Sequence, residues 1–482
     1  MVTYCGDEVA SLVLDVGGSW TRVGYSGDDA PKCVVPTYVG CLDSTGDETN
    51  AKTIRDQDQD VDMTDATKQS EEVPEDSSAA AKPSKPKRYI GDTEISAVRP
   101  GMTLKSPLQD KIVQDWDLFE DVWSYCLHNR LRVNPKENPL FITEASWNVP
   151  AAREKLIELA FEKFESPAFY ICKDAVLAAF AAGKSNALVL DCGGSTTSAV
   201  PVYDGYALKK GQLYQNIAGD FVSDQILAQI RRDYNLEVRS RYQVLKKNPV
   251  DVGQPANAVL RDFPSGKFTP SYHHYMQMQV IQEYKESVCQ ISESTYNENY
   301  LAARPQKPFE FPDGFNLQVG IERFRVPEVL FQPNQFITDK SKPVRQNGQV
   351  MDVSGMTPGP AVEGATTQTP STSFNMWGVP QMIHNSINSC DIDLRPHLLT
   401  NVVLTGGSTL FPGFADRVNF ELQSLAAGQR IKIHAPGNSI ERKYGTWIGG
   451  SILSSLGSFH QLWISRQEYQ ESGAAIVNKK CQ

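Results

Sequence analysis

The chain has 482 residues, which is too long for one compact core, so at least two lobes are expected. Its formal net charge of −10 argues against direct, sequence-specific DNA binding, because contacts to a phosphate backbone need clustered basic residues. Nine cysteines without a CxxC pair predict a reduced, intracellular protein without structural zinc, and no stretch approaches the roughly 18 apolar residues that a membrane span needs.

The N-terminal part of the chain is predicted to form β-hairpins, followed by an unstructured segment. Residues 9–36 hold alternating apolar runs broken by Gly17-Gly18 and by a second turn at residues 26–29. From residue 43 to residue 76 acidic and small polar residues dominate, and a basic run follows at residues 82–88. Such a composition cannot bury enough apolar surface to offset chain entropy, so we expect no fixed structure before Tyr89.

Further along the chain, helical spacing of apolar residues predicts amphipathic helices at 115–131 and 151–164. A second segment, roughly residues 338–373, is rich in Pro, Gly, Thr and Gln, and we expect it to be unstructured as well. Well-patterned sequence flanks both low-complexity segments, which indicates surface loops rather than links between domains.

A repeated motif is the most informative feature of the sequence. Residues 12–19 return at residues 188–195 with a single difference, and a strand-like run follows each copy. A related element occupies residues 402–409. Agreement between segments so far apart indicates a duplicated α/β domain.

The residue types of the repeat suit phosphate binding. Each apolar strand delivers an aspartate, Asp15 or Asp191, to the lip of a sheet, and the glycines after it allow a tight turn with open backbone N–H groups. Such groups can hold phosphate oxygens, and an aspartate beside them can hold Mg²⁺ through ordered water. Two such turns from opposed halves would grip a nucleotide from both sides. The alternative is that they are ordinary glycine-rich hairpins.

These turns resemble the phosphate and adenosine motifs of the ATPase superfamily that contains actin, the sugar kinases and Hsp70. The actin branch stands out over most of the chain, at residues 26–31, 129–133, 322–325, 330–333 and, almost throughout, 441–481. The chain is therefore identified as a member of the actin family. The resemblance implies an α/β actin/Hsp70/sugar-kinase ATPase fold with two duplicated lobes, in four subdomains, around a cleft that binds ATP and Mg²⁺.

The resemblance also implies subdomain boundaries and site residues. Subdomain 1 would comprise residues 1–36, 88–181 and 445–482, a reduced subdomain 2 residues 37–87, subdomain 3 residues 182–217 and 335–444, and subdomain 4 residues 218–334. Asp15 and Asp191 would hold Mg²⁺ through water. The residues implied to contact the nucleotide are Asp15, Gly17, Gly18, Ser19, Arg22, Asp191, Gly193, Gly194, Ser195, Lys285, Glu286, Gly406, Gly407, Ser408 and Lys443.

Three positions depart from the actin pattern. Actin positions its attacking water with a glutamine and a histidine, and Asp174 and Ser198 stand there instead, while Gly194 replaces a further aspartate. Losing the water-positioning pair should slow hydrolysis, because phosphoryl transfer depends on positioning and charge stabilisation. We therefore expect no catalytic residue, with ATP as a structural ligand that holds the halves together. The contrary hypothesis is that Asp174 acts as a base, as a carboxylate does in sugar kinases, in a slow ATPase or small-molecule kinase.

The two low-complexity segments fall where actin contacts the next subunit of its filament. A bulky loop at each contact would oppose head-to-tail packing, so a conventional filament protein is not expected. The alternative is a cytoplasmic actin-related protein of motor-linked filaments.

Residues 4–9 resemble the opening of the nuclear actin-related protein four subfamily, whose human relatives include the actin-like subunit of the BAF complex. This resemblance implies a subunit of chromatin-remodelling and histone acetyltransferase complexes in the nucleus. Its partners would be monomeric actin and a long helicase/SANT-associated helix of a remodeller ATPase or acetyltransferase scaffold. The acidic segment could contact histones or simply be solvated, and the basic run 82–88 could be a nuclear localisation signal or a linker.

Overall fold

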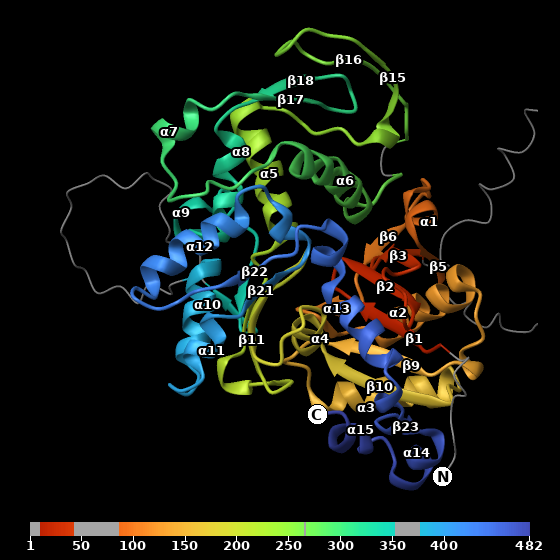
Figure 1. Ribbon diagram of the computed structural model, residues 1–482. Coiled ribbons are helices and arrows are strands. Elements are labelled where there is room, and N and C mark those ends of the chain that lie inside the picture. Colours follow the sequence, from red (N-terminus) through yellow and green to blue (C-terminus); the bar gives the residue numbers. More distant parts are fainter. Residues whose placement is uncertain (1–9, 43–85, 265–266, 352–375) are drawn as a thin grey trace, which may run out of the picture.

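The computed structural model describes residues 10–42, 86–264, 267–351 and 376–482 (Figure 1). The opening residues 4–9, the acidic segment 43–76 and residues 352–373 of the second low-complexity segment lie outside these ranges. The part of the basic run that is described begins a strand at Lys87, two residues before order was expected to resume.

The first lobe is built on a six-stranded sheet of order β23-β10-β9-β1-β2-β3. The hairpins expected within residues 9–36 are confirmed as β1 (Leu12–Val16), β2 (Trp20–Tyr25) and β3 (Cys33–Pro36), which pair antiparallel. Parallel to β1 runs β9 (Leu140–Glu144), followed by β10 (Ala168–Lys173) and the edge strand β23 (Ile464–Ser465).

The second lobe repeats this arrangement in an eight-stranded sheet. Its strand β11 pairs antiparallel with β12 and parallel with β21, as β1 does with β2 and β9, so the duplication expected from the sequence repeat is present in the fold. The strands of this sheet are β11 (Ala187–Cys192), β12 (Thr197–Tyr203), β13 (Tyr206–Ala207), β14 (Leu213–Gln215), β19 (Val344–Gln346), β20 (Gln349–Met351), β21 (Val402–Thr405) and β22 (Ile433–His434).

The beginning of the second low-complexity segment is ordered, contrary to expectation. Residues 344–351 form the hairpin β19–β20, and β19 pairs with β14 at the edge of the second-lobe sheet. The hairpin turns at Asn347 and Gly348, which both have positive φ, 49° and 78°. An Asn-Gly pair suits this turn because both residues tolerate positive φ, and that local preference outweighed the polar composition.

Helices cover the sheets, and two of them cross between the lobes. The helices expected at 115–131 and 151–164 are confirmed: α2 (Trp116–Ser124) and α3 (Pro150–Glu158) each continue into a wider π-helical turn, at Tyr125–Leu131 and Leu159–Lys163. The central pair is α4 (Asp174–Ala181) and α13 (Ser439–Ser455). A methyl group at Gly449 would lie 2.0 Å from the carbonyl oxygen of Leu177, so this close crossing requires a glycine.

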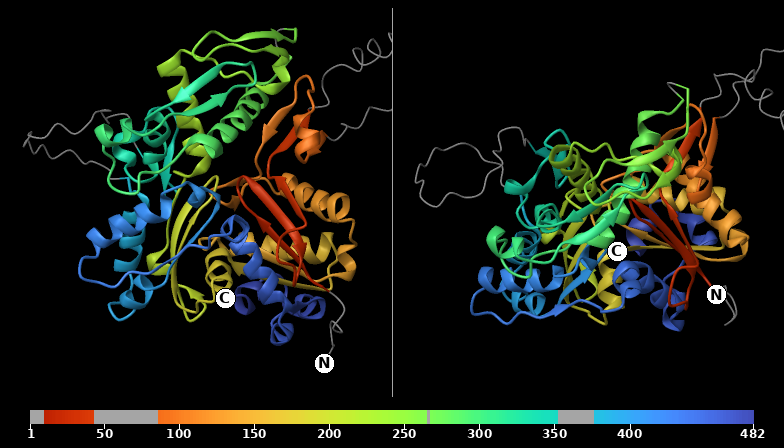
Figure 2. Two further views of the ribbon diagram at one scale, coloured as in Figure 1. Left: turned by 45° about the horizontal axis from the view of Figure 1, so that its top comes forward. Right: turned by 90° about the horizontal axis from the view of Figure 1, so that it is seen from above.

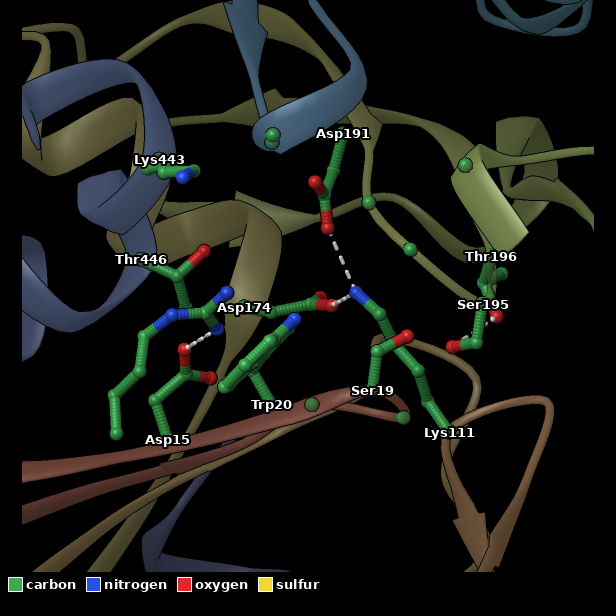
Figure 3. A pocket seen from close by; sticks show the side chains of 18 of the residues that line it. Asp15, Ser19, Trp20, Lys111, Asp174, Asp191, Ser195, Thr196, Lys443 and Thr446 are labelled. Carbon is green, nitrogen blue, oxygen red and sulfur yellow. Dashed lines mark hydrogen bonds and ion pairs between the residues drawn. The ribbon is translucent and has the colours of Figure 1, made fainter. Parts of the chain in front are cut away.

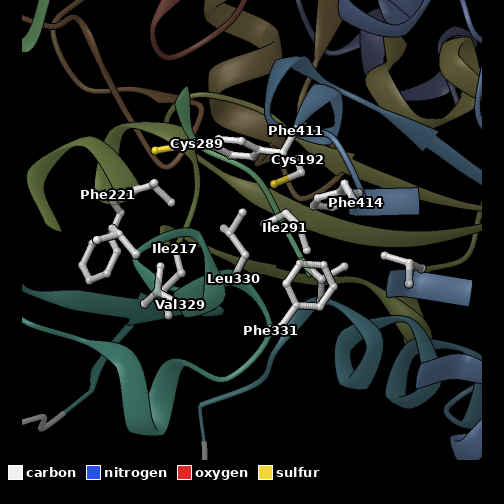
Figure 4. Close-up of a cluster of buried hydrophobic side chains, with 14 of the residues drawn as sticks. Cys192, Ile217, Phe221, Cys289, Ile291, Val329, Leu330, Phe331, Phe411 and Phe414 are labelled. Carbon is white, nitrogen blue, oxygen red and sulfur yellow. The ribbon is translucent and has the colours of Figure 1, made fainter. Parts of the chain in front are cut away.

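Each lobe has its own apolar core, as the burial of side chains on both sheets requires. Trp123 and Trp447 are fully buried in the first-lobe core, and Trp447 Nε1 donates to the carbonyl oxygen of Val13 at 3.0 Å. In the second lobe the β11 sheet packs on aromatic and aliphatic side chains, among them Phe331 and Phe414 with ring centroids 5.4 Å apart (Figure 4). These cores fix the strand ends that meet between the lobes.

Smaller sheets and helices complete each lobe (Figure 2). On the first lobe, β4 (Val39–Leu42) pairs with β5 (Lys87–Ile90) and β6 (Thr103–Lys105), and β7 (Leu108–Gln109) pairs with β8 (Ile112–Val113). On the second lobe, β15 (Val244–Asn248) pairs with β16 (Asn257–Leu260), and β17 (Lys307–Glu310) pairs with β18 (Asn316–Val319). The ladder β5-β4-β6 places residues 87–90 and 103–105 beside residues 39–42.

The remaining helices are α1 (Asp92–Ser96), α5 (Gly219–Tyr234), α6 (Pro270–Val288), α7 (Glu298–Ala302), α8 (Glu322–Arg325), α9 (Pro333–Phe336), α10 (Val379–Asn388), α11 (Arg395–Leu399), α12 (Phe414–Leu425), α14 (Arg466–Ser472) and α15 (Ile476–Lys480). No helix in the described ranges combines the length and the apolar character needed to cross a membrane.

Candidate functional site

A cavity of about 740 Å³ lies between the lobes, within the usual size range of small-molecule sites. Every residue that the actin resemblance assigns to the nucleotide lines this cavity, and so does Asp174. Ser198 is absent from the lining residues, since it is buried in β12 opposite Asp191. The structure thus gathers side chains from β1, β2, β11, β21, α6 and α13 around one space.

The two glycine turns meet face to face across the cleft. Each is closed by the same backbone hydrogen bond, from Gly17 N to the Trp20 carbonyl and from Gly193 N to the Thr196 carbonyl, both 3.0 Å. A methyl group at Gly18 would lie 2.0 Å from Ser195 Oγ, and one at Gly194 would lie 2.2 Å from the Oγ of its counterpart, Ser19. Each glycine therefore makes room for the serine of the opposite turn, which fits a ligand gripped between the lobes.

The two aspartates at the strand ends are each paired with a basic side chain (Figure 3). Asp15 Oδ1 accepts a hydrogen bond from Thr143 Oγ1 and Oδ2 accepts one from Arg22 Nη1, both at 2.7 Å. On the other side of the cleft, Asp191 Oδ2 accepts from Lys111 Nζ at 2.7 Å. Both carboxylates that were expected to orient magnesium waters are thus already neutralised by a cation of this chain.

Lys111, which the sequence interpretation missed, is the cation at the centre of the site. It stands at the tip of the β7–β8 hairpin, and its ammonium lies between two carboxylates, 2.7 Å from Asp191 Oδ2 and 2.8 Å from Asp174 Oδ2. Burial by itself would lower the pKa of Lys111, but the charges of Asp174 and Asp191 outweigh it and raise that pKa. The ammonium is therefore permanently charged at neutral pH. No periodicity or motif marks this lysine in the sequence, because only the fold brings it to the cleft.

Asp174, at the start of α4, has both carboxylate oxygens in use. Its Oδ1 accepts from Ser146 Oγ at 2.9 Å and from the backbone N–H of Ala175 at 2.8 Å, and Oδ2 accepts from Lys111. Asp174 as a whole residue is only 6% exposed. Three donors, one of them an ammonium, therefore occupy both of its carboxylate oxygens inside the cleft.

The third glycine turn and α6 close the opposite wall. Gly406 has φ 95°, and a methyl group there would lie 2.4 Å from Asp191 Oδ1, so the position admits only glycine. Ser408 Oγ donates to the carbonyl oxygen of Gly193 at 2.7 Å, which ties this turn to the second one. On α6, Lys285 Nζ donates to the carbonyl oxygen of Gly219 at 2.7 Å, and burial lowers the pKa of this lysine.

Among the other lining residues that were not expected from the sequence are Trp20, Tyr444 and Thr446. The guanidinium carbon of Arg22 lies 5.4 Å from the centroid of the Tyr444 ring, a distance typical of a cation–π contact. The aromatic ring therefore helps to hold Arg22 against Asp15.

The lining fits an anionic nucleotide better than it fits a magnesium ion. Four basic side chains line the cavity, namely Arg22, Lys111, Lys285 and Lys443. At Gly18, Gly194 and Gly406 a side chain would collide with neighbouring atoms, so these glycines keep the turns narrow. A magnesium ion shared by Asp15 and Asp191 would have to displace two ion pairs that the protein has already made. Within the described ranges, no group of three or more His, Cys, Asp or Glu side chains is placed to hold a metal ion.

Comparison with known proteins agrees with this arrangement. The family model described as "Actin" matches residues 6–482. A protein named "Actin-related protein 4" from Schizosaccharomyces pombe is 39% identical, and the alignment covers 99% of each chain. Proteins of the same name from Emericella nidulans and from Oryza sativa subsp. indica are each 36% identical over 99% of this chain, with 98% and 100% of their own length covered.

Proposed function

The chain belongs to the actin family and is an actin-related protein of the type named Actin-related protein 4, and we propose that it binds ATP between its lobes without hydrolysing it, as a scaffold subunit of nuclear chromatin complexes. The observation that carries the nucleotide part is the pair of facing glycine turns on a cavity in which Asp15, Asp174 and Asp191 each accept a hydrogen bond from a basic side chain. Such a cavity can hold phosphates, while the carboxylate that could serve as a base is bound to Lys111.

The engagement of Asp174 supports the absence of hydrolysis. To act as a base, Asp174 would have to take up a proton while giving up its bond to Lys111. A general base needs a carboxylate oxygen within hydrogen-bond reach of the water that it activates, and both oxygens of Asp174 already accept hydrogen bonds from the protein. Ser198 offers no substitute, because it is buried within β12 and does not line the cavity. This weighs against the slow ATPase and kinase alternatives.

A retained ATP would then act as a bridge between the lobes. The facing turns come from β1–β2 in the first lobe and β11–β12 in the second, so phosphate contacts on both sides favour the closed arrangement. A ligand that binds only this arrangement stabilises it by mass action. In such a protein ATP has the role of a structural component.

The scaffold role rests on the relatives and on the sequence resemblance. The Actin-related protein 4 proteins match the chain over almost its whole length. We propose that the chain resides in the nucleus, where it pairs with monomeric actin on a helicase/SANT-associated helix of a remodeller ATPase or an acetyltransferase scaffold. Tagged protein purified from nuclei should carry actin and one such scaffold. Purified protein that polymerised alone in Mg-ATP would refute the role and favour a filament protein.

The nucleotide itself provides the direct test. Freshly purified protein should contain ATP, and chromatography of the bound nucleotide over several hours at physiological temperature should show no increase in ADP. Steady conversion to ADP would refute the non-hydrolysing proposal and would restore Asp174 as a candidate base. Protein without any adenine nucleotide would refute the proposed site.

A further inference from the structure

The β7–β8 hairpin reaches across the cleft with a strained tip. Its two tip residues, Asp110 and Lys111, have positive φ values of 50° and 62°. This left-handed region is unfavourable for residues with a side chain, and hairpin turns of this kind prefer Asn and Gly. Strained backbone of this kind persists only where surrounding contacts hold it in place, so the side chains of Asp110 and Lys111 are expected to make such contacts.

Both side chains of the tip bind the opposite lobe. Asp110 accepts from Arg345 Nε in β19 at 2.9 Å and 3.1 Å through its two oxygens. The carbonyl oxygen of Asp110 accepts from Trp147 Nε1 at 2.9 Å, and the Trp147 ring stacks on Tyr214 of β14 with centroids 4.2 Å apart. The hairpin tip that carries Lys111 is thereby anchored through Asp110.

The ammonium of Lys111 lies between an aspartate of each lobe. Asp174 directly follows β10 of the first-lobe sheet, and Asp191 lies near the end of β11 in the second. An ammonium has three N–H donors, of which these two carboxylates take two. The third can serve a ligand oxygen in the cavity that Lys111 lines. A cation that joins protein carboxylates to a phosphate oxygen does there what a divalent metal ion commonly does.

We propose that Lys111 is a tethered counter-ion that replaces the divalent cation, so that this chain binds and retains ATP without Mg²⁺. The inference rests on the proposed nucleotide site and specifies how that site is charged. The ion pair between Arg22 and Asp15 acts in the same way, because it neutralises the other aspartate that was expected to hold the magnesium ion. In this proposal two basic side chains of the protein, Lys111 and Arg22, take the place of the magnesium ion expected from the sequence.

The test measures retention of bound ATP in the full-length protein, with excess EDTA or with excess MgCl₂. Wild-type protein should lose ATP at rates that differ by less than about threefold between the two conditions, because its counter-ion cannot be chelated. Lys111→Met keeps the side-chain stem but removes the charge. Lys111→Gly also relieves the left-handed strain, so it guards against a folding defect. Both variants should lose ATP at least about tenfold faster in EDTA than in MgCl₂, since the two carboxylates then need another cation.

A matched control is Asp204→Gly. Asp204 has φ 49° at the exposed tip of the β12–β13 hairpin, so the substitution relieves the same kind of strain away from the cleft, and its ATP retention should equal that of wild type in both conditions. The inference is overturned if wild-type protein loses ATP more than threefold faster in EDTA, or if the Lys111 variants are as insensitive to EDTA as wild type. Wild-type protein without ATP in either condition would instead refute the proposed function.

Discussion

Substituting Gly18 should weaken ATP binding by a mechanism that a second substitution can reverse. In Gly18→Ala the new methyl carbon would lie 2.0 Å from Ser195 Oγ and 2.7 Å from Ser195 Cβ, on the opposite lobe. Rotation of Ser195 moves its hydroxyl but leaves Cβ in place, so the lobes must separate. Overpacking of this kind costs about 1–3 kcal/mol. Since the cost falls on the closed arrangement that binds ATP, affinity should fall by about 5- to 150-fold.

The rescue distinguishes this explanation from the loss of a phosphate contact. Adding Ser195→Gly removes both colliding atoms and should restore much of the affinity, whereas Ser195→Ala keeps Cβ at 2.7 Å and should restore little. ATP binding can be measured by calorimetric titration of Gly18→Ala, of both Ser195 single variants and of both double variants. These affinities give the coupling energy between position 18 and each Ser195 substitution, because the effect of each Ser195 substitution alone is subtracted. Equal rescue by both Ser195 variants, or rescue by neither, would refute the argument from lobe contact.

Two further predictions concern ion pairs away from the cleft. Arg417→Met leaves the fully buried Glu328 without its partner and should destabilise the second lobe by about 3–5 kcal/mol in thermal unfolding, while adding Glu328→Gln should recover most of it. Burial raises the folded-state pKa of Glu328. The stability of Arg417→Met should therefore fall as the pH rises above 4.5, the pKa of Glu328 in the unfolded chain. A loss of stability that does not depend on pH would contradict this. Burial acts to raise the pKa of Glu468, but Lys480 and the α14 cap outweigh burial and lower it. The ionised Glu468 therefore stabilises α14 at pH values above the unfolded-state pKa of Glu468, and this stabilisation is lost as the pH falls. Glu468→Gln should therefore speed amide exchange in α14 at neutral pH but not below about pH 3, and equal exchange at neutral pH would refute the effect.

Much of the site could be predicted from the sequence because its geometry is local. The repeat places an aspartate at a strand end and glycines in the next turn, and those two facts already imply two equivalent turns. Close approach of the serine of the opposite turn explains why glycine stands at Gly18 and Gly194, and close approach of Asp191 explains it at Gly406. The hairpin turn at Asn347-Gly348 was equally local, yet composition concealed it within a polar segment.

Lys111 could not be predicted from the sequence because its role depends on long-range placement. It lies 63 residues before Asp174 and 80 before Asp191, and neither partner belongs to its hairpin. The neighbouring sequence contains no periodic or motif pattern that distinguishes a solvated turn lysine from one that enters a cleft. The contacts of Asp110 with Arg345 and Trp147 hold the tip at the cleft, and both partners are distant in the sequence.

One arrangement connects the proposed retention of ATP with the proposed lack of hydrolysis. Lys111 bonds Asp191 across the cleft and at the same time occupies the Asp174 oxygen that a base would need. Its position is fixed by Asp110, whose pairing with Arg345 also joins the lobes. A site that turned ATP over would have to release that oxygen, and releasing it would free Lys111 from one of its two carboxylates. Under the proposed function, the contacts that join the lobes therefore also keep Asp174 from acting as a base, which suits a protein in which ATP serves as structure.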